Sequence, residues 1–258
     1  MSLNNNTVIK VSCVVLLGTQ LFSVAYLSDR ISNVENRPSV EQPNIEELVQ
    51  NALVKARANE AQQKAQLKLQ TLRQNAKLAP EYSDDGLIYG PADAKYSISV
   101  FTDIECPYCR KMHGEVKRVV DSSDGAVNWK VIHFPLRRHN PAAAIQAQTL
   151  ECVKDSYGNR TAWAFLDAMI AETEGNGKGI ADLPEFGGDM GLSRSLISNC
   201  LISDDNKGKI NADYQRGLDA GITGTPAMMI TNNETGRSSL VKGLQDSPAI
   251  ALEIQKLL

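Results

Sequence analysis

The pattern of hydrophobic and polar positions divides the chain into four parts. An apolar run at residues 11–27 comes first, and a polar tract with two prolines follows at 31–43. Residues 44–79 lack glycine and proline and are dominated by strong helix formers, so they are predicted to form one long helix. From residue 80 to 258, short β-type runs flank a stretch of helical periodicity, which indicates an α/β domain.

The α/β part has a readable order of elements. Its β-type runs are "YSISV" (96–100), "WKVIHF" (129–134), "AMMI" (227–230) and "SSLV" (238–241), the last two joined by the turn "TNNETG". Helical segments are predicted directly after the first strand, at 142–157, 162–172, 192–202 and 210–220, and from Ser247 to the C-terminus. The predicted order is strand, helix, strand, a helical insertion at about 140–220, hairpin and helix.

Residues 1–30 have the order of a secretory signal. A polar start with Lys10 precedes the apolar run, and a polar tract follows it. The run of about 17 residues is at the short limit for a membrane span, and Ser23-Val24-Ala25 offers a cleavage site. The sequence therefore predicts export, with a cleaved signal peptide and a membrane anchor both open, and 31–43 as a linker. Cys13 is interpreted as a residue of the apolar segment.

The long helix predicted at 44–79 has clear ends and a thin apolar stripe. Asn44 and Glu47 form a possible capping box, and Pro80 is expected to stop the helix. The apolar positions fall into two sets, which are Ile45, Leu48, Val49, Ala52, Leu53 and Ala56, and then Ala61, Ala65, Leu69, Leu72 and Ala76. Such a stripe should pack on the body of the protein or on the same helix of another subunit, which predicts a homo-oligomer. The alternative is a solvated stalk.

Composition and charge exclude some classes of function. The hydrophobic fraction of 42% is ordinary for a globular protein, and the net charge of -3 gives no basic excess that would favour nucleic acid. The five cysteines are too few for a small disulfide scaffold and oddly placed for a zinc ribbon. Each cysteine must therefore be interpreted by its position.

The stretch "FTDIECPYCRKMH" (101–113) places two cysteines where a strand ends and a helix begins. Only a thiolate attacks a disulfide, and unpaired N–H groups at a helix start favour the thiolate form. Cys106 is therefore predicted to attack, and Cys109, one turn deeper, to resolve the mixed disulfide. Pro107 restricts the backbone between them and Tyr108 completes the motif.

Two other interpretations of this pair remain open at the sequence level. Cys106, Cys109 and His113 could supply three metal ligands, but no second ligand pair with zinc-site spacing follows, so no metal is expected. Two inert packing thiols are the other alternative.

Three motifs in this order resemble the DsbA family of periplasmic thiol:disulfide oxidoreductases. They are "FTDIECPYCRKMH", "HFPLRRHNPAA" (133–143) and "GITGTPAMMI" (221–230), and the resemblance covers about 86–258. It implies a thioredoxin fold with an inserted helical domain, no cofactor, and catalysis by Cys106 and Cys109. It further implies that Pro226 is a cis-proline facing the cysteines and that the backbone of Thr225 pairs with substrate. The implied partners are cysteine-containing exported proteins and a membrane redox partner that regenerates the cysteine pair.

Details of the motifs refine this resemblance. Thr225 before the proline, together with C-P-Y-C, is similar to the DsbC, DsbG and ScsC-like members, which implies an isomerase or reductase; these isomerases oligomerise through an N-terminal segment. A DsbA-like oxidase on a stalk and a chaperone with incidental redox activity are the alternatives. Thioredoxin relatives usually carry a buried acid six residues before the first cysteine, where this chain has Val100. His139 is expected to make a loop or capping contact.

Cys152 and Cys200 both lie in the predicted helical insertion. Some members of the family that the motifs resemble carry a second, structural disulfide there. In an oxidising compartment two such cysteines are expected to be paired. A structural disulfide between them is therefore predicted.

Overall fold

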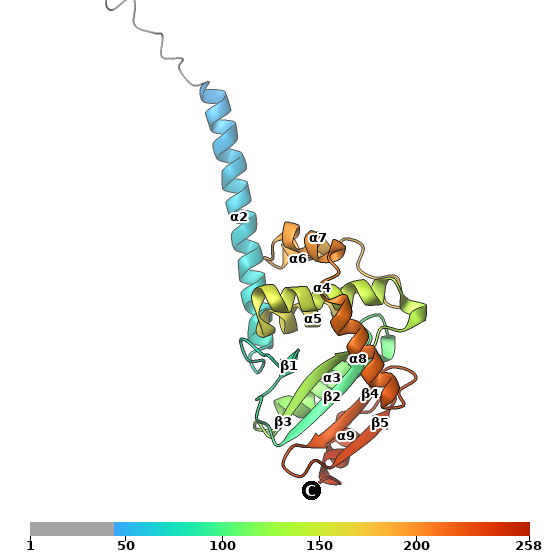
Figure 1. Ribbon diagram of the computed structural model, residues 1–258. Coiled ribbons are helices and arrows are strands. Elements are labelled where there is room, and N and C mark those ends of the chain that lie inside the picture. The colour runs from blue at the N-terminus through green and yellow to red at the C-terminus, as the bar shows by residue number, and fades with distance from the viewer. Residues whose placement is uncertain (1–43) are drawn as a thin grey trace, which may run out of the picture. The chain divides into compact units, whose positions relative to one another are not determined.

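The computed structural model describes residues 44–258 (Figure 1). The predicted signal or anchor at 1–30, with its apolar run at 11–27, and the linker at 31–43 lie outside the described residues. The chain divides into two units, Met1–Lys55 and Ala56–Leu258. Within residues 44–258, no helix is both long enough and apolar enough to cross a membrane.

The long helix α2 spans Ile45–Asn75. The side chain of Asn44 caps it by accepting the Glu46 N–H at 3.1 Å. The helix ends four residues before the predicted end at Ala79, because the Ala76 N–H is shared between two carbonyls and the chain turns. This turn lets Ala76 and Ala79 become fully buried.

The two apolar sets of α2 have different environments. In the second set, Leu69 and Leu72 are partly buried against the hydrophobic core of their own unit. In the first set, Ile45, Leu48 and Leu53 are 77%, 52% and 46% exposed. Leu69 and Leu72 of the second set therefore pack within their own unit, whereas the first set is exposed among the described residues 44–258.

A five-stranded mixed sheet forms the centre of the second unit, in the order β1-β3-β2-β4-β5. Its strands are β1 (Ile88–Tyr89), β2 (Tyr96–Thr102), β3 (Val127–His133), β4 (Ala227–Asn232) and β5 (Ser238–Lys242). β2 pairs in parallel with β3 and antiparallel with β4, and β4 with β5 forms the predicted hairpin. The predicted strands are thus confirmed, whereas β1, with two residues, is too short to give a sequence pattern.

The helices agree with the predicted order. They are α3 (Pro107–Asp121), the short 3₁₀ helix η1 (Arg137–His139), α4 (Ala142–Tyr157), α5 (Asn159–Glu172), α6 (Leu183–Asp189), α7 (Arg194–Ile202), α8 (Lys207–Asp219) and α9 (Ser247–Gln255). Helices α4 to α8 are inserted between β3 and β4, as predicted. The seven-residue α6 was not predicted, since its two glycines interrupt any helical pattern.

Alternating side chains of the sheet build two cores. Ile98 and Val100 of β2 face the larger core, which also contains Met112 and Val116 of α3 and Ile250 of α9. Residues of opposite orientation form the smaller core, which contains Phe101, Ile132, Phe134, Ile222 and Ala227, with Tyr214 of α8 packed against it. Period-two burial in β2 thus places α3 and α8 on different faces of the sheet. β2 is left in the middle of the sheet, with its carboxyl end leading into α3.

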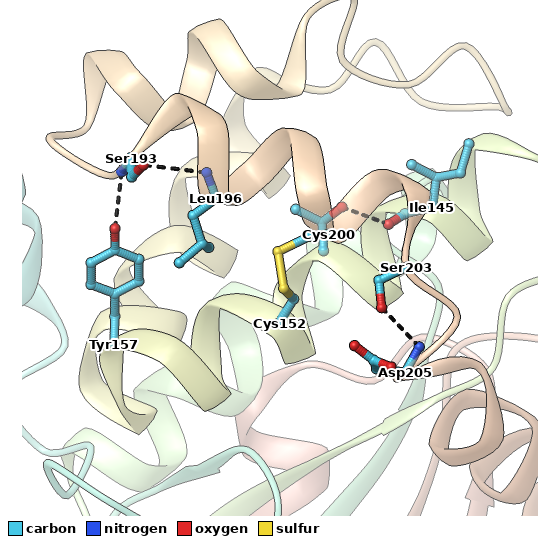
Figure 2. The surroundings of a disulfide bond; sticks show 9 residues. Ile145, Cys152, Tyr157, Ser193, Leu196, Cys200, Ser203 and Asp205 are labelled. Atoms are coloured by element: carbon cyan, nitrogen blue, oxygen red, sulfur yellow. Dashed lines mark hydrogen bonds between the residues drawn. A yellow bond between two sulfur atoms is a disulfide. The ribbon is translucent and has the colours of Figure 1, made fainter.

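Within the insertion, α4 and α7 are joined by a disulfide between Cys152 and Cys200, whose Cα atoms are 5.9 Å apart (Figure 2). A hydrogen bond also connects the end of α4 to the start of α7, where the Ser193 N–H donates to the Tyr157 hydroxyl at 3.0 Å. Ser193 Oγ also caps α7 by accepting the Leu196 N–H. The pairing of Cys152 with Cys200 is the one expected from the sequence.

Candidate active site

The C-P-Y-C motif lies just beyond the carboxyl end of the central strand β2, where helix α3 begins. Cys106 is the N-cap of α3 and Pro107 is its first residue, where a missing N–H is harmless. The Cys106 N–H donates to the Asp103 carbonyl at 3.0 Å, and the Cys106 carbonyl accepts the first helical bond from Arg110. The sulfur of Cys106 therefore lies where the N–H groups of the first turn have no carbonyl partner.

The Cys106 thiol is ionised far more readily than an ordinary cysteine. Its residue is 1% exposed, and both Cys106 and Cys109 are free thiols. A hydrogen bond from the Cys109 thiol is the largest cause that lowers the pKa of Cys106, and burial opposes it. With the backbone N–H groups of Cys109 and Tyr108 also donating, the pKa falls to about 5. Cys106 is thus a thiolate at neutral pH.

Cys109 has the opposite electrostatic environment. It is 3% exposed, and burial is the main reason that its pKa lies well above the usual range, followed by its contact with Cys106. Its sulfur accepts the Asp103 N–H at 3.5 Å. The pair therefore holds one thiolate and one protonated thiol, which is the arrangement that attack followed by resolution requires.

The loop that precedes β4 lies next to this pair of cysteines. The Thr225–Pro226 peptide bond is cis. The Thr225 carbonyl oxygen lies 3.6 Å from Cys106 Sγ, and the Pro226 carbonyl accepts the Gly243 N–H at 2.9 Å. The structure thus brings together Cys106, Cys109, Thr225 and Pro226, although Cys106 and Thr225 are 119 residues apart.

A hollow of about 450 Å³ opens beside Cys106. Its lining consists of Cys106, Pro107, Tyr108, Lys111, Arg138, His139 and Asn176. Tyr108 is 58% exposed at this surface, so its ring is available to a docked chain. The hollow combines residues of α3, η1 and the segment after α5.

Asp103 and His139 form a buried pair behind the cysteines that sequence reasoning did not assign. His139 Nδ1 donates to Asp103 Oδ2 at 2.8 Å, and the two residues are 3% and 2% exposed. The Arg138 Nε–H approaches His139 Nε2 at 3.4 Å, so both ring nitrogens of His139 have a neighbour. His139 therefore does more than the expected loop or capping contact. Burial raises the pKa of Asp103, and its hydrogen bonds oppose that shift.

The acid expected from thioredoxin relatives is absent at Val100, which is buried in the larger core. Glu105 is the other acid near the cysteines, and it is fully buried. Its carboxylate contacts residues 173–179, a connection that sequence reasoning missed. The charged residues of "TDIE" between a buried strand and Cys106 were the available signal.

The metal alternative does not fit the geometry. His113 Nε2 is 2.6 Å from Asp167 Oδ1, so its ring is engaged by α5. Among residues 44–258, no group of three or more histidine, cysteine, aspartate or glutamate side chains could hold a metal ion.

Comparison with known proteins gives one family and related thiol proteins. A family model described as thioredoxin matches residues 82–246, more than half of the chain. The DsbC thiol:disulfide interchange proteins of Salmonella typhimurium and Dickeya dadantii are 29% identical over 146 residues and 30% identical over 147 residues. Each match covers 57% of this chain and 47% of the relative, so the chain spans about half the length of these relatives.

A solved structure extends the comparison over nearly the whole of a related protein. Pseudomonas aeruginosa DsbA2 is 32% identical, and the match covers 69% of this chain and 97% of that chain with a TM-score of 0.62. BdbD from Bacillus subtilis, at 15% identity and a TM-score of 0.58, has the same fold. The resemblance and the fold class predicted from the motifs are thereby confirmed. The chain belongs to the thioredoxin family, within its DsbA and DsbC group of thiol:disulfide oxidoreductases.

Proposed function

We propose that this protein catalyses thiol:disulfide interchange in exported proteins, with Cys106 as the attacking thiol and Cys109 as the resolving thiol. The observation that carries the proposal is the split between the two thiols. The pKa of Cys106 falls to about 5, while burial raises the pKa of Cys109. A pair of inert packing thiols would have no reason to differ in this way.

The chemistry follows from this split. The Cys106 thiolate attacks one sulfur of a substrate disulfide, a mixed disulfide forms, and the other substrate sulfur leaves as a thiolate. Cys109 then loses its proton and attacks Cys106 Sγ, which releases the second substrate thiolate and leaves a Cys106–Cys109 disulfide. The substrate gains two electrons and the pair loses two. When a second thiolate of the substrate resolves the mixed disulfide instead, no electrons are exchanged and the substrate is isomerised.

The loop with Thr225 and Pro226 is the proposed substrate platform. The Thr225 carbonyl oxygen lies 3.6 Å from Cys106 Sγ, which supports this assignment. A substrate chain that pairs with the backbone of Thr225 would bring the substrate's sulfur close to Cys106. Tyr108, exposed at the hollow, is placed to contact the same chain.

We favour isomerisation or reduction of substrate disulfides over oxidation of substrate thiols. The support comes from the first apolar set of α2, which includes Leu48, Val49 and Leu53 and is exposed among the described residues 44–258. A second copy of the helix could cover it, and the resulting oligomer would bring several active sites together. A DsbA-like oxidase is the alternative if the helix is only a stalk.

The proposed compartment is the periplasm. The disulfide between Cys152 and Cys200 supports it, since such bonds persist where the environment is oxidising. The proposed partners are exported proteins with cysteines and a membrane redox protein that regenerates the pair.

The test is the recovery of activity from a scrambled, fully oxidised ribonuclease. The full chain is compared with a Val49→Gln, Leu53→Gln variant and with a control, Leu67→Gln, which changes a 65% exposed leucine of α2 outside both apolar sets. Light scattering gives the oligomeric state of each. We expect the full chain and the control to be oligomers that recover ribonuclease, and the double variant to be a monomer with reduced recovery.

Other outcomes have definite meanings. No recovery by any form, with rapid oxidation of reduced ribonuclease by all, would identify an oxidase. Neither reaction with any form would refute the proposed interchange activity.

A further inference from the structure

Glu105 is the residue immediately before the attacking cysteine, and it is completely buried. Buried glutamates are uncommon unless they are paired with a cation. None of the salt bridges among the described residues includes this carboxylate. The interchange chemistry derived above does not use it either, so its presence beside Cys106 needs another explanation.

Four hydrogen-bond donors of the helical insertion converge on the two oxygens of Glu105. Oε1 accepts from Gln146 Nε2 of α4 at 2.7 Å and from the Thr173 hydroxyl. Oε2 accepts from the N–H groups of Gly177 and Gly179 at 3.0 and 2.9 Å. The negative charge is therefore stabilised by neutral donors alone, and every donor belongs to the insertion.

The segment at 173–179 is shaped around this carboxylate. Gly175, Asn176, Gly177 and Gly179 all have positive φ angles, of 76°, 57°, 87° and 77°. The loop turns tightly at these residues, and the N–H groups of Gly177 and Gly179 both point at the carboxylate while the Lys178 N–H bonds to the Gly175 carbonyl. The Asn176 N–H also donates to the Glu105 carbonyl at 2.8 Å, so the main chain and the side chain of Glu105 hold the same loop.

This loop reaches the active site. Asn176 lines the hollow beside Cys106, together with Tyr108 and Arg138. A Cβ on Gly177 would lie 3.1 Å from the Cα of His139, so the loop also packs closely on η1. The place of one wall of the hollow thus depends on the contacts with Glu105.

We propose that Glu105 is a positioning residue that fixes the 173–179 loop as a wall of the hollow, and that this loop selects which disulfide-containing chains reach Cys106. The proposal rests on the proposed interchange function. It predicts that a polypeptide disulfide, which must fit against the wall, depends on Glu105. A small disulfide such as oxidised glutathione, which needs little of that wall, does not.

The test is the Glu105→Gln variant of the full chain. The glutamine can present its NH2 group to the Gln146 amide oxygen and the Thr173 hydroxyl and keep its oxygen toward Gly177 and Gly179, but the bonds from these two N–H groups then end on a neutral amide and are weaker than bonds to a carboxylate. We expect amide hydrogen exchange at Gly177 and Gly179 to become at least about tenfold faster. We also expect KM for a disulfide-linked peptide to rise about tenfold, with kcat and the reaction with oxidised glutathione changed by less than about twofold.

The control is Glu174→Gln, the same chemical change in the same loop. Glu174 pairs with Lys178 at the surface and does not line the hollow, so neither readout should change. If Glu105→Gln does not fold, Thr173→Val removes one of the four donors and leaves the carboxylate in place. It should shift both readouts in the same direction by a smaller factor.

Two results would overturn the proposal. One is unchanged amide exchange and an unchanged ratio of peptide to glutathione reaction in Glu105→Gln. The other is an equal loss with both disulfides together with a shifted pKa of Cys106, since Glu105 would then act on the thiol and not on the loop. If the unaltered protein reacts with neither disulfide, the proposed function fails, and the amide exchange still decides whether Glu105 holds the loop.

Discussion

The two cysteine pairs of the described chain are in opposite states, although three of the four cysteines are buried and Cys152 is partly buried. Cys106, Cys109 and Cys200 are 1%, 3% and 4% exposed. The first pair is free and has two residues between its members, whereas Cys152 and Cys200 are joined across a separation of 48 residues. Burial alone therefore does not decide whether a cysteine is reactive or structural.

The difference lies in what surrounds each sulfur. Cys106 stands at the N-terminus of α3, where the Cys109 thiol contributes most to stabilising its thiolate and the N–H groups of Cys109 and Tyr108, which have no carbonyl partner, add to it. Cys152 lies in the interior of α4, where the helix uses its own N–H groups. Reactivity thus comes from the start of a helix, and structural pairing comes from two helices packed side by side.

The largest effect should come from Cys106→Ser. Without the thiolate, interchange with oxidised glutathione and with peptide disulfides should fall by roughly three orders of magnitude or more. The measurement is the rate of disulfide exchange followed by mass spectrometry. The Cys109→Ser variant is the matched control, because it should still attack and then accumulate the mixed disulfide on Cys106. A Cys106→Ser protein that keeps its full biological activity would contradict this role and favour a chaperone.

Removal of the disulfide between Cys152 and Cys200 should lower the stability of the protein and leave its interchange activity in place. The Cys152→Ser, Cys200→Ser variant is expected to lose about 2–4 kcal/mol of unfolding free energy, because the unfolded chain is no longer closed over 48 residues. Interchange should remain, since neither residue lines the hollow beside Cys106. Urea denaturation measures the first effect and glutathione exchange the second. An exchange defect as large as that of Cys106→Ser would remove the distinction between the pairs.

The reactive pair was readable from sequence because its determinants are local. A β-type run, two cysteines and a proline at the helix start all lie within a few residues of one another, and local patterns report such elements well. The strands β2 to β5 were predicted for the same reason.

The contacts of the buried acids near the cysteines could not be predicted from the sequence, because their partners are distant in the chain. Asp103 meets His139 across 36 residues, and Glu105 meets Gly179 across 74. These contacts exist only after the insertion has folded onto the sheet edge. The predicted end of α2 was wrong for a related reason. Burial of Ala76 and Ala79 against the rest of their unit overrides the helix propensity of the segment.

The pH dependence of Cys106 gives an intermediate effect. Its pKa is lowered from 9.0 to about 5, so the native state favours the ionised form more than the unfolded state does. The resulting stabilisation of the reduced protein is complete above pH 9, declines as the pH falls, and is lost below about pH 5. At pH 7 it amounts to at most about 2.7 kcal/mol, and solvent in the hollow screens part of it.

Alkylation by iodoacetamide measures this shift directly. The rate at Cys106 should rise with a midpoint near pH 5 in the reduced protein. The Cys106→Ser variant is the control, and its remaining Cys109 should not react in this range because its pKa lies above the ordinary value. A midpoint near 9 would mean that the helix start does not activate Cys106.

The smallest effect is expected for Pro107→Ala. Proline at the start of α3 stabilises chiefly by restricting the unfolded chain, so its loss should lower the unfolding free energy by about 0.4–1 kcal/mol. Pro248→Ala in the first turn of α9 is the matched control, and it should have a similar effect in urea denaturation.

The same variant separates the backbone constraint from the activation of the thiol. The groups that lower the pKa of Cys106 include the thiol and N–H of Cys109 and the N–H of Tyr108, none of which belongs to Pro107. The alkylation midpoint of Pro107→Ala should therefore stay near pH 5 while its stability falls. If the midpoint instead moved toward 9, the rigid proline would be part of what distinguishes the reactive pair from the structural one. The hydrogen bonds at the start of α3 would then not suffice to account for the difference.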